Sequence, residues 1–173
     1  MGYPEADAEA FVETARSFSD ILIDTSSIIV LSAIGALETA SQTWELVTIP
    51  EAVSETGALL INIKEGSIKI RQIKPQNPEN IKSKTNTDQL LVETAKKHHL
   101  PLLAEDRKIL IAAEEAGLLC FDSLVAIELL KGLSSQGARS YSDWHNRILL
   151  RNKYSPYRLS WAERIAIAIM KLV

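Results

Sequence analysis

Four acidic residues stand where strands or helices are expected to begin or end, and they are the side chains best suited to chemistry. They are Asp24, Glu55, Asp88 and Asp106. Asp24 follows the apolar run 21–23, and hydroxyl residues of the kind that begin helices come directly after it. Because burying an unpaired carboxylate costs several kcal/mol, an aspartate in that place needs a partner. We expect an amide, a cationic side chain or a metal ion.

The four carboxylates are predicted to share one face of the protein. In a parallel sheet, the strand ends and the helix starts that follow them lie at the same edge. Carboxylates gathered there repel one another unless a cation lies between them. Ligands that are all oxygen favour a hard ion such as Mg²⁺ or Mn²⁺, which can activate a water and stabilise the leaving oxygen of a phosphodiester. The pattern therefore predicts a metal-assisted hydrolytic site.

Short apolar strands alternate with helices along the first three quarters of the chain. Strands are predicted at residues 21–24, 46–49, 68–73, 100–104 and 118–121. Residues 68–73 alternate apolar and charged side chains, which is typical of an edge strand with one wet face. The alternation predicts an α/β fold with a mostly parallel central sheet flanked by helices.

Helices are predicted between these strands. They are expected at residues 4–18, 28–40, 51–60, 87–98, 107–116 and 123–131, with a loop at 74–86. Gly35 is a possible joint within the second of them. Gly117 and Gly132 are expected to close the last two, because glycine is common just after a helix C-terminus.

The chain of 173 residues is predicted to form one main domain, residues 1–131 with a core at 20–131, and a C-terminal helical extension, residues 132–173. Residues 134–142 are rich in Ser and Gly and are interpreted as a linker, with helices at about 142–151 and 160–173. The two parts differ in charge. Residues 1–130 carry 20 acidic and 11 basic side chains, whereas residues 131–173 carry two acidic and eight basic ones.

The extension also holds aromatic residues among its cations: Trp144, Tyr154, Tyr157 and Trp161. Cations interleaved with aromatic rings suit RNA, whose bases stack on rings while its phosphates meet arginines. An amphipathic helix pair that covers the main domain or a second subunit has the same composition. The sequence leaves both interpretations open.

Four segments taken together resemble the PIN-domain family. They are residues 23–26 (IDTS), 48–55 (TIPEAVSE), 87–91 (TDQLL) and 102–107 (LLAEDR), in the order and at the spacing of that family. PIN domains are metal-dependent ribonucleases, and many are toxins of bacterial toxin–antitoxin pairs. The resemblance covers about residues 20–131, and it implies a PIN-like fold and cleavage of RNA phosphodiester bonds by a metal-activated water.

The resemblance also implies roles for individual residues. Asp24, Glu55, Asp88 and Asp106 match the catalytic acids, with Asp24, Asp88 and Asp106 expected to bind Mg²⁺ or Mn²⁺ and Glu55 to complete the shell or orient the water. The expected supporting residues are Thr25, Ser26 and Glu105. Independently of the resemblance, the cationic side chains of Arg107, Lys108, Arg147 and Arg151 are candidate RNA contacts, because they can meet phosphates. One departure is Ala104, where the family often has threonine, and the lost hydroxyl could weaken the positioning of substrate or water.

The expected partner is therefore an RNA substrate, and an antitoxin protein and a second copy of the chain stay open. The alternative function is a catalytically weak or inactive PIN-fold module that binds RNA or a protein. No run of 18 uncharged apolar residues occurs, so no membrane span is expected. The acidic residues 1–20 differ from the basic start of a signal peptide, which predicts a cytoplasmic protein.

A second motif, Asp122 and Ser123 before a helix, resembles the phosphopantetheine attachment site of acyl carrier proteins. Those proteins are small helical bundles, whereas a strand-like run, residues 118–121, precedes Ser123 here. We therefore interpret Asp122 or Ser123 as the N-cap of the helix that follows.

Overall fold

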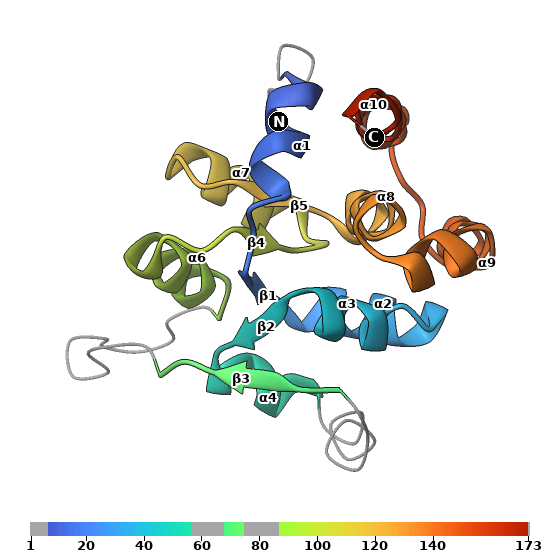
Figure 1. Ribbon diagram of the computed structural model, residues 1–173. Helices are drawn as coiled ribbons and strands as arrows, with labels where there is room; N and C mark the ends of the chain where they lie inside the picture. The colour runs from blue at the N-terminus through green and yellow to red at the C-terminus, as the bar shows by residue number, and fades with distance from the viewer. Residues whose placement is uncertain (1–6, 57–67, 75–86, 173) are drawn as a thin grey trace.

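Five strands of the described chain form one sheet at the centre of the protein (Figure 1). The structure is a computed structural model that describes residues 7–56, 68–74 and 87–172, without the side chains of 54–56. The strands are β1 (Asp20–Ile23), β2 (Glu45–Thr48), β3 (Ile70–Gln72), β4 (Leu102–Leu103) and β5 (Cys120–Phe121). Every neighbouring pair is parallel, which confirms the predicted α/β fold with a mostly parallel sheet.

The order of the strands, β3-β2-β1-β4-β5, reverses direction at β1. The chain passes from β1 outward to β2 and β3, and then returns to place β4 on the other side of β1. Open α/β sheets bind ligands at the carboxyl ends of the strands where such a reversal occurs. β3 is an edge strand, as its alternating pattern predicts.

Nine helices pack around the sheet in the described part of the chain. They are α1 (Ala8–Ala15), α2 (Thr25–Ile34), α3 (Leu37–Thr43), α4 (Pro50–Thr56), α6 (Thr87–His98), α7 (Arg107–Glu115), α8 (Ser123–Leu133), α9 (Ser135–Arg151) and α10 (Pro156–Leu172). Gly35 has φ 81° between α2 and α3, so the predicted joint is confirmed. The predicted loop at 75–86 and the predicted helical residues 57–60 lie outside the described residues.

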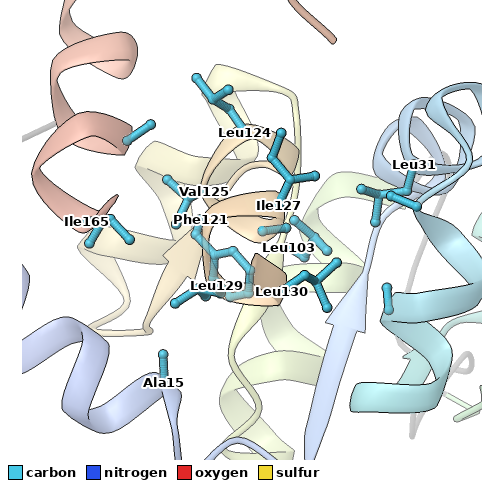
Figure 2. Close-up of a cluster of buried hydrophobic side chains, with 14 of the residues drawn as sticks. Ala15, Leu31, Leu103, Phe121, Leu124, Val125, Ile127, Leu129, Leu130 and Ile165 are labelled. Atoms are coloured by element: carbon cyan, nitrogen blue, oxygen red, sulfur yellow. The ribbon is translucent and has the colours of Figure 1, made fainter. Parts of the chain in front are cut away.

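Successive strand residues point to opposite faces of the sheet, and each face is buried under helices. Ile21 and Ile23 belong to a large cluster with α1, α2, α3, α8, α9 and α10, whereas Leu22 faces a smaller cluster with α4, α6 and α7. Phe121 lies in the large cluster among side chains of α8 (Figure 2). The ring of Phe18 stacks on it with centroids 6.1 Å apart. Because both faces of the central strands are covered by helices, the sequences of these strands are continuous apolar runs.

The predicted linker at 134–142 is wrong, because these residues form the first half of α9. The Ser134 hydroxyl caps the helix and accepts a hydrogen bond from the Gly137 amide at 2.9 Å. A Cβ at Gly137 would lie 2.0 Å from the Leu130 carbonyl oxygen, so α9 can approach the end of α8 this closely only with glycine there. The serines and glycines therefore mark a tight corner between helices. Gly132 likewise lies inside α8 and does not close it.

The C-terminal helices contribute to the large cluster. Trp144 and Ile148 of α9 and Trp161 and Ile165 of α10 are buried. α8 packs against both α9 and α10 (Figure 1). The interpretation of these residues as an amphipathic helix pair that packs on the main domain is thus confirmed. Within the described residues, no helix has both the length and the apolar character needed to cross a membrane.

Candidate acidic site at the carboxyl edge of the sheet

Asp24 follows β1 directly and is the N-cap of α2. Its side chain is 3% exposed. The Ser27 amide donates to Oδ1 at 2.7 Å and the Ser26 hydroxyl donates to Oδ2 at 2.5 Å. The Glu105 amide, at the end of the neighbouring strand β4, also donates to this carboxylate. Asp24 is in none of the ion pairs that the described residues form.

Burial raises the pKa of Asp24 above its ordinary value, although the hydrogen bonds from Ser26, Ser27 and Glu105 oppose the shift. The donors around the carboxylate are therefore too few to offset the loss of water, which stabilises the charged form best. A cation beside Asp24 would favour the charged form and lower that pKa. The residue is suited to binding a positive ligand.

Two more carboxylates lie at the ends of β4 and β5. Glu105 follows β4, and its Oε1 accepts a hydrogen bond from the Ser123 amide at 2.7 Å. Asp122 follows β5 and is the N-cap of α8, where its Oδ1 accepts from the Val125 amide at 2.9 Å. Three adjacent strands, β1, β4 and β5, thus each place a carboxylate at the same edge, and it is buried at Asp24 and Asp122 and partly buried at Glu105.

Arg158 of α10 joins the two carboxylates beyond β1. Its Nε lies 2.5 Å from Asp122 Oδ2, and its Nη2 lies 3.3 Å from Glu105 Oε2. The Tyr154 hydroxyl donates to the same Glu105 oxygen at 3.2 Å, and the guanidinium lies 4.6 Å from the centroid of the Tyr154 ring. Burial and the charge of Asp122 raise the pKa of Glu105, whereas the Ser123 hydrogen bonds and Arg158 oppose this shift. The C-terminal region therefore supplies a cation to the acidic edge.

The other predicted catalytic acids lie at the starts of α6 and α7 and within α4. Asp106 is exposed and caps α7, where its Oδ1 accepts from the Lys108 amide at 2.6 Å. Asp88 is half-buried in the first turn of α6. Glu55 belongs to α4, but its side chain lies outside the described residues. The hydroxyl of Thr25 donates to the Ala52 carbonyl at 3.1 Å, which ties the start of α2 to α4.

The structure therefore brings Asp24 together with Glu105, the residue before Asp106, where the strand order reverses. It places the other predicted acids on separate elements, Asp88 on α6, Asp106 just before α7 and Glu55 on α4. α6 leads into β4, and a helix that precedes a parallel strand runs against it, so Asp88 starts its helix toward the carboxyl edge.

The donor chemistry at this edge suits a hard divalent cation, because the side chains are carboxylates and hydroxyls. Among the described residues, however, no group of three or more His, Cys, Asp and Glu side chains is arranged to hold a metal ion. The described side chains alone thus do not complete a metal shell. Glu55 is not among those side chains, because its own side chain lies outside the described residues.

The candidate RNA contacts lie on two helices. Arg107 and Lys108 are exposed at the start of α7. Arg147 of α9 is exposed and pairs with Asp143 at 2.8 Å, and Arg151 is exposed at the end of the same helix.

Sequence reasoning missed Asp122, Tyr154 and Arg158 as members of the acidic edge. Asp122 follows the apolar run 118–121 just as Asp24 follows 21–23, so the same strand-end criterion would have found it. Arg158 lies 36 residues beyond Asp122, and no local pattern links the two.

Compared with protein-family models, with curated proteins and with solved structures, the chain matches none.

Proposed function

We propose that the protein is a PIN-like endoribonuclease that requires Mg²⁺ or Mn²⁺. The observation that carries the proposal is the Asp24 carboxylate, which is 3% exposed and forms no ion pair with the described residues. It lies at the carboxyl end of β1, beside β4, where the strand order reverses. A buried carboxylate in a ligand-binding position of an open parallel sheet supports a role in binding a cation.

The proposed roles are those that the resemblance to PIN domains implies. Asp24, Asp88 and Asp106 would bind the ion, and Glu55 would complete the shell or orient the water. The ion, when bound, supplies an activated water and neutralises charge on the leaving oxygen of the phosphodiester. Ser26 and the Glu105 amide keep the Asp24 carboxylate in one orientation. Ala104 has no hydroxyl to offer at this edge. The hydroxyl that donates to Asp24 comes from Ser26 instead.

Cleavage of a labelled single-stranded RNA by the purified full chain tests the proposal. Cleavage is expected with Mg²⁺ or Mn²⁺ and not with chelator. Asp24→Asn and Asp106→Asn are each expected to lower the rate by about a thousandfold, the upper range for removing one charge-stabilising group. The matched control is Asp7→Asn, because Asp7 is also an N-cap, accepting from the Glu9 amide at 2.9 Å, and asparagine keeps that role. Full cleavage by both site variants would refute the assignment.

The second candidate is a catalytically weak module that binds RNA or a protein. Arg158 favours it, because this side chain already compensates Glu105 and Asp122 at the acidic edge. A module of this kind binds RNA equally well with or without Mn²⁺ and does not cut it. Calorimetric titration of the protein with Mn²⁺ separates the two candidates, since only the nuclease needs the ion.

The remaining expectations are the partners and the location. An RNA substrate follows from the proposed activity. An antitoxin protein, a second copy of the chain and a cytoplasmic location stay predictions from the sequence.

A further inference from the structure

A basic pocket of about 430 Å³ lies beside the acidic edge. It is formed by the start of α7, the residues between α9 and α10, and the first turn of α10. The residues that line it are Arg107, Leu110, Lys153, Ser155, Tyr157 and Arg158. We propose that this basic pocket binds one nucleotide of a single-stranded RNA, an inference that rests on the proposed nuclease function and names its substrate class.

The charge of the basic pocket is positive. Three of its lining residues are cations, and none of the described lining residues is acidic. The charge of Arg158 is already engaged by Glu105 and Asp122. Arg107 and Lys153 are exposed and form no ion pair with the described residues. These two side chains are therefore placed to attract a phosphate from two different parts of the chain.

The aromatic and apolar residues that line the pocket are suited to contact a nucleotide base, in addition to the phosphate that the cations attract. Tyr157 is half-buried and offers an aromatic ring, on which any of the four bases can stack. Leu110 is fully buried and gives the pocket an apolar floor. Pockets that bind small organic ligands have volumes of roughly 300–1,000 Å³, so this one has room for a nucleotide.

The position of the basic pocket connects it to the proposed chemistry. Arg107 is the residue after Asp106, and Arg158 forms part of both the pocket wall and the acidic edge. The Arg158 Nη1 also reaches the Glu105 carbonyl at 3.5 Å. A nucleotide held in the basic pocket therefore lies beside the acidic edge and next to the segment that carries Asp106, one of the proposed catalytic acids.

Fluorescence anisotropy with a labelled oligouridylate of about eight nucleotides, a length typical of single-strand binding sites, tests this inference. The full chain is used in chelator, so that binding is measured without cleavage. Arg107→Gln and Lys153→Gln are each expected to raise Kd about tenfold and to reduce the slope of log K against log salt by about 0.7. Tyr157→Leu is expected to raise Kd about tenfold with an unchanged slope, because it removes stacking and no charge.

Lys96→Gln of α6 and Arg139→Gln of α9 are the matched controls, because they remove exposed cations outside the basic pocket. Their Kd is expected to stay within about twofold of the parent value. Lys153→Arg keeps the charge and is expected to restore binding. The circular dichroism spectrum and the melting temperature of each variant exclude misfolding as the cause of a loss.

An equal loss in the Lys96 and Arg139 variants would overturn the pocket in favour of a diffuse cationic surface, and unchanged binding in the pocket variants would also overturn it. The test of the basic pocket and the test of the nuclease activity can fail independently. A parent chain that binds RNA through the pocket but does not cut it with Mn²⁺ refutes only the nuclease. A chain that cuts RNA but is insensitive to the pocket variants refutes only the pocket.

Discussion

Arg158 and Asp122 form an ion pair in which the arginine Nε lies 2.5 Å from the aspartate Oδ2, joining the start of α10 to the end of β5. The two side chains are 16% and 5% exposed. Glu105 shares the same guanidinium, so one cation compensates two buried carboxylates. The C-terminal helices are therefore held to the sheet by charge at its carboxyl edge, as well as by apolar packing on its face.

Arg158→Met is expected to destabilise the fold by about 3 kcal/mol, because it leaves two buried carboxylates without their cation. Urea unfolding followed by circular dichroism measures the loss. The control is Arg147→Met, which removes an exposed pair with Asp143 and is expected to cost less than about 0.5 kcal/mol. Equal, small losses in the two variants would mean that the buried pair contributes no more than a surface pair.

Mn²⁺ is expected to stabilise the parent chain by about 2.7 kcal/mol at a hundred times its Kd, because an ion that binds only the folded state shifts the unfolding equilibrium. Asp24→Asn should lose this stabilisation, while Asp7→Asn keeps it. Thermal unfolding with Mn²⁺ and with chelator makes the comparison. A metal-dependent gain that persists in Asp24→Asn would place the ion elsewhere.

Glu128→Gln is expected to make the free energy of unfolding less dependent on pH. Glu128 is buried in α8, where the Tyr141 hydroxyl donates to its Oε1, and burial raises its pKa above the ordinary value of 4.5. Because the folded pKa exceeds the unfolded one, the folded state binds more protons between the two values. The parent therefore loses stability as pH rises from about 4.5 through the raised pKa.

The variant lacks this titration, so its stability relative to the parent should increase over the same interval and then level off. Urea unfolding of both chains at several pH values gives the difference. Asp24 and Glu105 also have raised pKa values, so part of the dependence should remain in the variant. A difference that stays constant with pH would show that Glu128 titrates alike in the folded and unfolded states.

Gly137→Ala is expected to destabilise the fold by about 2 kcal/mol, the cost of forcing an extra methyl group into a packed contact. The new Cβ would lie 2.0 Å from the backbone oxygen of Leu130, which cannot rotate away. Gly132→Ala is the comparison, since its Cβ would meet the Ile169 Cγ2 at the longer distance of 2.7 Å, a contact that a small shift of α10 relieves more easily than the backbone clash at 2.0 Å. Thermal melts of the two variants should differ clearly, and equal melting temperatures would contradict the close approach.

The strands and the position of Asp24 could be predicted from the sequence because their signals are local. β1, β4 and β5 each belong to an apolar run that ends at an acidic residue, and their buried faces make those runs continuous. The joint at Gly35 is also local, because a left-handed backbone conformation favours glycine.

The contacts that complete the acidic edge could not be predicted, because they depend on tertiary packing. Arg158 reaches Asp122 only after α9 turns back across α8, and that turn depends on Gly137 fitting against Leu130. In the sequence, the same glycine indicated a linker. Asp122 was correctly interpreted as an N-cap, but its second oxygen remained free to meet a distant cation.

The placement of Arg158 has a consequence for the timing of synthesis. Asp122, the later of the two carboxylates, leaves the ribosome 36 residues before Arg158, an interval of roughly 2–7 s at about 5–20 residues per second. During that interval the nascent chain has the two strand-end carboxylates but not the guanidinium that compensates them. The acidic edge is therefore among the last parts of the protein to mature, and a chain whose translation stops before α10 carries it in an unfinished form.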